Sequence, residues 1–123
     1  MIMRKKGYLD YVNLKLGTAS VRRYGNGNTQ PLVGVPYGMS NWAIQTDSNR
    51  GSWYYHPQDR SFEGIRLTHM ACNWLGDYGQ MIFMPQTGEP MHAADSRWSS
   101  FRPSDTVLRP DYLKLTALRY RYT

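Results

Sequence analysis

Cysteine and long apolar runs are nearly absent from this sequence of 123 residues. The single cysteine, Cys72, excludes an internal disulfide and gives no indication of an oxidising compartment. No apolar run approaches membrane-spanning length, and Gly7 to Tyr11 follow the basic Arg4-Lys5-Lys6 where a secretory leader would be apolar. The sequence therefore predicts no membrane partner and shows no signal peptide, which as it stands suggests a cytoplasmic chain.

Acidic residues are also few, and none adjoins another acid. Glycoside hydrolysis in its common form needs two carboxyl groups held across a sugar, and nothing in the sequence nominates such a pair. His69 and Cys72 have the spacing of a metal pair, but a closed zinc site needs further ligands, and only His56 and His92 remain. We therefore predict no catalytic residue and no metal site in this chain, with Cys72 as a buried thiol.

Basic residues outnumber acidic ones, 15 to 9, which gives a formal charge of +6. Such an excess is typical of nucleic-acid-binding proteins, where clustered Lys and Arg neutralise phosphates. Here the basic residues are mostly scattered, apart from the Arg4-Lys5-Lys6 run and the Arg22-Arg23 pair, and no nucleic-acid motif is present. A solvated surface explains the charge better, so we expect no nucleic-acid partner.

A β-rich fold is predicted by 10 Tyr, 4 Trp, 11 Gly and 7 Pro together with the lack of helical periodicity. Trp42 and Ile44 are expected on the same face of one strand, and Trp98 and Phe101 are expected to anchor the irregular region from Glu89 to Pro110. The strand-like segments are Tyr8–Leu16, Leu32–Met39 (short or irregular), Ser40–Gln45, Ser52–His56, Ile65–Thr68, Gln80–Met84 and Tyr112–Tyr122. The last of them runs to the final residues without a turn or cap, which suggests a piece of something longer.

The stretch from Gly64 to Gly88 has the clearest functional character. Its two strand-like runs flank a loop rich in His, Asn, Trp, Asp and Tyr and bracketed by Gly76 and Gly79. Flat rings with hydrogen-bonding neighbours suit a sugar, although Trp74 and Tyr78 could equally cap the core.

Four ordered segments resemble the N-terminal domain of family 92 of the glycoside hydrolases, the calcium-dependent α-mannosidases. The segments are Gly25 to Pro31, Val35-Pro36-Tyr37-Gly38-Met39, Gly64 to His69 with Trp74 to Gly79 and Met84-Pro85, and Pro110-Asp111-Tyr112-Leu113. The resemblance covers roughly Val12 to Thr123. It departs from the family at Met70-Ala71-Cys72-Asn73, where related members have Gln-Pro-Ser-Pro, and at Leu14-Lys15-Leu16 in place of Pro-Phe-Ile.

The resemblance implies an all-β fold, an incomplete β-sandwich with long loops over residues 1–123. Family members continue into an α/α-barrel domain that supplies the general acid, the general base and the calcium carboxylates, so calcium is implied for a full-length enzyme and not for this chain. Full-length members hydrolyse terminal α-mannosides with inversion, which makes mannose-containing glycans and the C-terminal catalytic domain the implied partners. Related enzymes are often secreted or periplasmic.

The resemblance also nominates sugar-contacting residues, with Trp74 first and Asn28, His69 and Asp77 after it. Each has a structural alternative: Asn28 as a turn former, His69 as a loop brace and Asp77 as an acceptor of backbone N–H groups. Two further functions stay open, a stand-alone carbohydrate-binding or structural β-sandwich and a basic nucleic-acid-binding protein.

Overall fold

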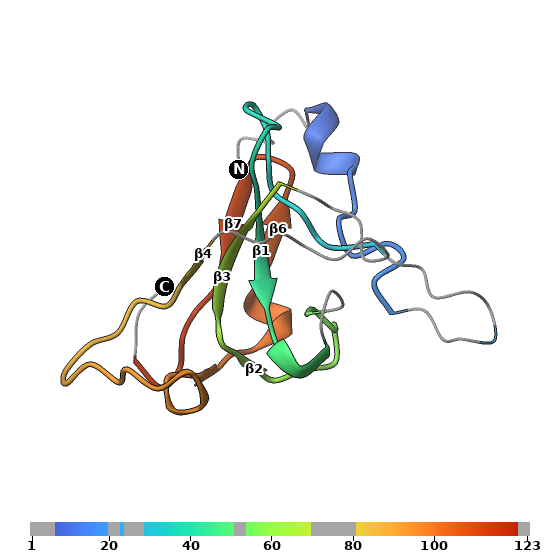
Figure 1. The fold of residues 1–123 in the computed structure, drawn as a ribbon. Helices are drawn as coiled ribbons and strands as arrows, with labels where there is room; N and C mark the ends of the chain where they lie inside the picture. Colours follow the sequence, from blue (N-terminus) through green and yellow to red (C-terminus); the bar gives the residue numbers. More distant parts are fainter. Residues whose placement is uncertain (1–6, 20–22, 24–28, 51–53, 70–80, 121–123) are drawn as a thin grey trace, which may run out of the picture.

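A computed structural model describes residues 7–19, 23, 29–50, 54–69 and 81–120. Within these residues the secondary structure consists of short strands and single turns of 3-10 helix, so the fold is all-β (Figure 1). No described helix is long and apolar enough to cross a membrane. The predicted fold class is confirmed.

A 3-stranded antiparallel sheet in the order β1-β3-β4 forms the main layer. Its strands are β1 (Asn41–Gln45), β3 (Gly64–Thr68) and β4 (Met81–Phe83). The first two pair along their whole length, with Asn41 opposite Thr68 at one end and Gln45 opposite Gly64 at the other. This register defines the two ends of the sheet.

Two smaller antiparallel pairs lie beside this sheet. One joins β2 (Ser61–Phe62) to β5 (Ser99–Ser100), and the other joins β6 (Val107–Arg109) to β7 (Tyr112–Lys114). The core that the sheets share is built from Ala43, Ile44, Tyr54, Tyr55, Phe62, Phe101, Leu115, Ala117 and Tyr120. Apolar side chains from separate strands thus meet in one cluster, which is the usual driving force for a sheet-on-sheet arrangement.

Three of the sequence-predicted strands agree with the structure. The segments Ser40–Gln45, Ile65–Thr68 and Gln80–Met84 correspond to β1, β3 and β4. Leu32–Met39 contributes only an isolated bridge between Val33 and Trp42, as expected of an irregular strand. Alternation identified the first two of these strands and a nearly continuous apolar run identified the third, of which Gln80 lies outside the described residues.

The expected strand Tyr8–Leu16 is wrong: the chain forms a 3-10 helix, η1 (Tyr8–Tyr11), followed by turns. The Asp10 carboxylate accepts a hydrogen bond from the Gly7 amide at 2.8 Å, and the Asp10 amide donates to the Gly7 carbonyl at 3.0 Å. Local side-chain bonds of this kind compete with strand pairing. The side chain of Tyr8 is 95% exposed, so the loose alternation in this segment does not reflect a buried strand face.

Two further expectations near the C-terminal end hold only in part. Phe101, 4% exposed, anchors its region in the core, whereas Trp98 is 44% exposed and packs against the Arg119 guanidinium, 5.4 Å from the ring centroid. The expected strand Tyr112–Tyr122 is correct for β7, which ends at Lys114, and wrong for Leu118 to Tyr120, which form a turn; Arg121 and Tyr122 lie outside the described residues. The turn is fixed by hydrogen bonds from the Leu118 amide to the Ser100 carbonyl and from the Arg119 amide to the Ser99 hydroxyl.

The expected strand Ser52–His56 lies partly outside the described residues. Its described part, Tyr54 to His56, is not a strand, although the Tyr54 carbonyl accepts hydrogen bonds from the amides of Thr46 and Asp47. Because both amides donate to a single carbonyl, this segment lacks the repeated hydrogen bonds of a paired β-strand.

Candidate functional site

His69 lies at the end of the main sheet where β3 finishes. It directly follows Thr68, and its exposed imidazole Nδ1 is 3.0 Å from the carbonyl oxygen of Met39. Because Thr68 pairs with Asn41, the residues that lead into β1 lie next to His69. The contact between His69 and Met39 therefore joins two of the segments that carry the family resemblance.

A third such segment meets them. The amides of Gly34 and Val35 both donate to the carbonyl of Pro110, at 3.0 and 2.9 Å. Pro110 is buried and begins the turn between β6 and β7, so the 35–39 segment is held against this hairpin. Segments far apart in the sequence are thus assembled at one end of the fold.

An open hollow of about 420 Å³ lies in this region. Its lining combines aromatic and apolar side chains with one carboxylate: Val33, Gly34, Val35, Tyr37, Met39, Ser40, Trp42 and Asp111. Tyr37 and Met39 are 84% and 85% exposed, so their side chains are accessible to a ligand. Aromatic faces beside polar groups are the chemistry by which proteins hold sugars.

The tautomer of His69 follows from its partner. A carbonyl oxygen only accepts, so Nδ1 carries the proton that is donated to Met39. In the neutral imidazole this leaves Nε2 as an acceptor, which can receive a hydrogen bond from a hydroxyl group. The contact with Met39 thus fixes the position of the imidazole at this end of the sheet.

The other nominated residues, Asn28, Trp74 and Asp77, lie outside the described residues. The lone Cys72 does as well. Sequence reasoning did not single out Tyr37, Trp42 or Asp111 as site residues, although Tyr37 and Asp111 belong to motifs of the resemblance. Trp42 belongs to none of these motifs, and its alternation with Ile44 predicts only that both side chains lie on one face of a strand.

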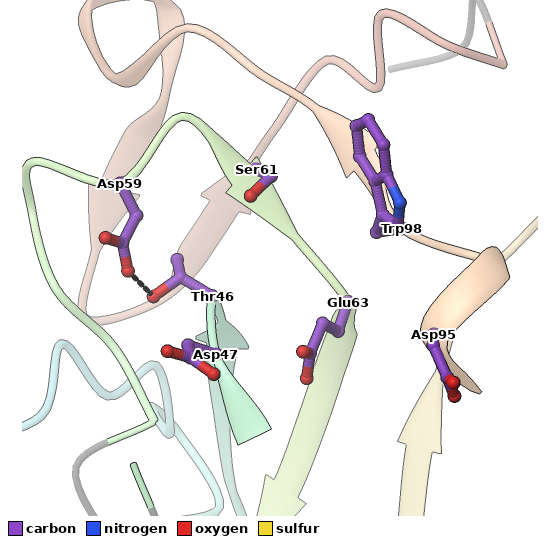
Figure 2. A pocket seen from close by; sticks show the side chains of 7 residues that line it. All are labelled: Thr46, Asp47, Asp59, Ser61, Glu63, Asp95 and Trp98. Carbon is purple, nitrogen blue, oxygen red and sulfur yellow. Dashed lines mark hydrogen bonds between the residues drawn. The ribbon is translucent and has the colours of Figure 1, made fainter. Parts of the chain in front are cut away.

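A second hollow, of about 310 Å³, lies at the opposite end of the sheet (Figure 2). Its side chains come from the segments after β1, before β3 and before β5: Thr46, Asp47, Asp59, Ser61, Glu63, Asp95 and Trp98. The end to which it belongs is fixed by register, since Gln45 precedes Thr46 and pairs with Gly64. The fold therefore gathers carboxylates that the sequence did not pair.

Two of these carboxylates, Glu63 and Asp59, hold the fold together through hydrogen bonds. Glu63 accepts hydrogen bonds from Gln45 Nε2 at 2.7 Å and from the amide and hydroxyl of Ser48 at 2.9 and 3.2 Å. Asp59 accepts from the hydroxyl of buried Thr46, as Figure 2 shows. Carboxylates satisfied in this way fix the path of the loops around them.

Tyr55 is the neighbouring group with a perturbed acidity. Burial raises the pKa of its hydroxyl above the ordinary value of 10.0, and the negative charge of Asp59 adds to this. Both effects disfavour the phenolate, so Tyr55 acts as a neutral hydroxyl. Within the described ranges, no group of three or more His, Cys, Asp or Glu side chains is placed to hold a metal ion.

Comparison with known proteins identifies the family to which this chain belongs. Residues 11–122 match the model of the glycosyl hydrolase family 92 N-terminal domain, and the chain belongs to this family. None of the curated protein sequences compared with it matches.

Solved structures agree with the family assignment. An inverting mannosidase of family GH92 from Bacteroides thetaiotaomicron superposes with a TM-score of 0.79 at 34% identity, over 94% of this chain and 16% of that one. A GH92 α-mannosidase from the same organism gives 0.78 at 23% identity, over 98% of this chain and 17% of that one, which supports the fold. The chain thus spans about a sixth of the length of these enzymes.

Proposed function

We propose that this chain is the part of an α-mannosidase that contributes loop residues to the pocket for a terminal α-mannoside. The observation that carries the proposal is the meeting of three family segments around His69, Met39 and Pro110, beside the hollow that contains Tyr37 and Trp42. An end of a sheet that brings aromatic rings, an imidazole and a carboxylate together has the composition of a sugar subsite.

His69 and Trp74 have distinct proposed roles. The hydrogen bond to Met39 holds the exposed imidazole beside the hollow, where His69 is proposed as a polar contact of the sugar. Trp74, nominated by the family motif, provides the flat face on which the sugar ring lies. Asn28 and Asp77 are proposed as further polar contacts, from the same motifs.

The chemistry of bond cleavage is proposed to come from the rest of the enzyme. The resemblance implies that a helical barrel domain supplies the general acid, the general base and the calcium carboxylates. An inverting mechanism needs an acid and a base on opposite faces of the sugar, and the acidic hollow lies at the other end of the sheet from His69. We therefore propose that the 123-residue chain is inactive by itself.

The second candidate is a stand-alone carbohydrate-binding module. The exposed rings of Tyr37 and Trp42 favour it, because they are presented without help from another domain. A salt titration separates both proposals from nucleic-acid binding, since phosphate contacts weaken steeply with salt and neutral sugar contacts do not.

A chimera tests the proposal. In it, this chain replaces the matched segment of the 34%-identical Bacteroides inverting mannosidase. We expect the chimera to hydrolyse an α-mannoside and the isolated chain to show no hydrolysis. A chimera that folds like its parent and does not hydrolyse mannoside would reject the mannosidase role, and sugar binding by the isolated chain would then favour the stand-alone module.

A further inference from the structure

A two-residue turn places Asp111 at the hollow of about 420 Å³. Arg109 and Tyr112 are the last cross-strand pair of β6 and β7, so Pro110 and Asp111 alone connect the two strands. The Pro110 carbonyl accepts hydrogen bonds from the amides of residues 34–35, which also line the hollow. A short turn that is hydrogen-bonded to its neighbour leaves the backbone of Asp111 little freedom to move.

A guanidinium group orients the carboxylate of Asp111. Arg109 Nε donates a hydrogen bond to Asp111 Oδ1 at 3.1 Å, and Arg109 Nη1 lies 2.8 Å from Asp10 Oδ1. The second oxygen of Asp10 accepts a hydrogen bond from the Gly7 amide at 2.8 Å, so the guanidinium is itself anchored to η1. The planar guanidinium thus holds two carboxylates in fixed directions, one on η1 and one at the hollow.

The Asp111 carboxylate retains the capacity to bind a ligand. An ionised carboxylate has about four acceptor positions, and the hydrogen bond from Arg109 uses one of them. The Asp111 side chain is 35% exposed and lines the hollow together with the exposed rings of Tyr37 and Trp42. Hydroxyl groups at the rim of a sugar ring can donate to such a carboxylate while the ring lies against an aromatic face. A cationic ligand is disfavoured, because the chain carries a formal charge of +6.

The hollow adjoins the position proposed for the terminal mannose. The Met39 carbonyl accepts the hydrogen bond from His69, and Met39 also lines the hollow. The two places are therefore neighbours, with Met39 between His69 and the lining that contains Asp111. A sugar ring in the hollow would be the one that follows the ring at His69 along a glycan.

We propose that Asp111 is a specificity-determining residue, which accepts hydrogen bonds from hydroxyls of the sugar to which the terminal mannose is attached. Arg109 is a positioning residue for this carboxylate. The inference rests on the proposed function and narrows its substrate class to mannosides whose leaving group is a second sugar with free hydroxyls. An aryl or methyl α-mannoside has no hydroxyl at this position and gains no affinity from Asp111.

Asp111→Asn in the Bacteroides chimera tests the contact, with a mannosyl disaccharide and an aryl α-mannoside as the two substrates. The kcat/KM for the disaccharide should fall about tenfold, because a charged acceptor is lost, and the kcat/KM for the aryl α-mannoside should fall less than about twofold. Asp105→Asn on η5 (Pro103–Asp105) is the matched control and should change neither value. The Asp105 carboxylate is also paired with an arginine, at 3.8 Å from Arg102, and is not part of the lining of the hollow.

Arg109→Gln tests the positioning role. It should lower kcat/KM for the disaccharide more than for the aryl α-mannoside. The double variant with Asp111→Asn should match Asp111→Asn alone, because Arg109 acts on the sugar only through the carboxylate. Thermal unfolding of each variant separates these effects from loss of the fold. If Arg109→Gln unfolds, the comparison of Asp111→Asn with Asp105→Asn decides the inference by itself.

An NMR titration of the 123-residue chain separates this inference from the proposed function. We expect the disaccharide to bind more tightly than methyl α-mannoside, and Asp111→Asn to remove the difference. An inactive chimera combined with this binding pattern supports the Asp111 contact and counts against the proposed function. An active chimera in which Asp111→Asn affects both substrates equally, or no more than Asp105→Asn does, supports the proposed function and overturns the inference. An inactive chimera with no difference in binding overturns both.

Discussion

The imidazole of His69 is hydrogen-bonded to the carbonyl of Met39 across 3.0 Å, and this contact joins the residue after β3 to the segment before β1. The hydrogen bond therefore fixes the position of His69 relative to residues 35–39. The affinity for a ligand that contacts either of them is expected to depend on this hydrogen bond.

His69→Ala in the active chimera tests this link. The substitution removes the brace and the proposed sugar contact, so KM for an α-mannoside should rise about fivefold, which corresponds to ~1 kcal/mol for one hydrogen bond. The turnover number should change less, because His69 is not proposed to act on the bond that breaks. The control is His92→Ala, at an exposed histidine, and an equal effect of both substitutions would contradict the role of His69.

Phe62→Ala tests the core. The Phe62 side chain is 1% exposed and meets the Phe101 ring edge-on, with the centroids 5.8 Å apart. Its removal should lower the free energy of unfolding by about 3–5 kcal/mol, as measured by urea denaturation. Phe62→Leu should cost less, and Leu16→Ala at an exposed position should stay within about 0.5 kcal/mol of the wild type.

Gly64→Ala tests the close approach of β4 to β3. An added Cβ at Gly64 would lie 2.8 Å from the Phe83 carbonyl oxygen and would overlap the Ile82 side chain. Separating the strands should cost about 1–3 kcal/mol of stability. Gly38→Ala is the control, since a Cβ there meets nothing within 4 Å. Equal stability of the two variants would show that β4 does not pack as described.

The raised pKa of Tyr55 predicts how the stability of the fold changes at alkaline pH. Burial, reinforced by Asp59, raises the pKa of Tyr55 above 10.0, so the folded form keeps its proton where the unfolded form releases it. The stability from this group is present in full below about pH 10 and is lost as the pH rises through the folded pKa. The urea midpoint should fall less steeply for Tyr55→Phe than for the wild type between about pH 9 and pH 11. Tyr8→Phe, at a 95% exposed side chain, should behave like the wild type.

Alternation in the sequence predicted β1 and β3, and a nearly continuous apolar run predicted β4. Alternation failed at Tyr8–Tyr11, where the Asp10 carboxylate accepts a hydrogen bond from the Gly7 amide. It also failed beyond Lys114, where the Ser99 hydroxyl and the Ser100 carbonyl accept hydrogen bonds that hold the chain in a turn. Trp98 was predicted to be a core residue because the sequence does not show that the Arg119 guanidinium packs on its ring near the surface. The motif resemblance nominated His69, while its partner Met39 and the neighbouring Trp42 are set by tertiary pairing that local sequence does not encode.

Trp74→Ala in the chimera with the Bacteroides enzyme tests most directly whether this chain supplies the surface on which the sugar lies. KM for an α-mannoside should rise about tenfold or more, because a buried aromatic side chain contributes about 1.5–3 kcal/mol, while the thermal midpoint stays unchanged. An unaltered KM, or loss of the fold on substitution, would contradict the proposed role.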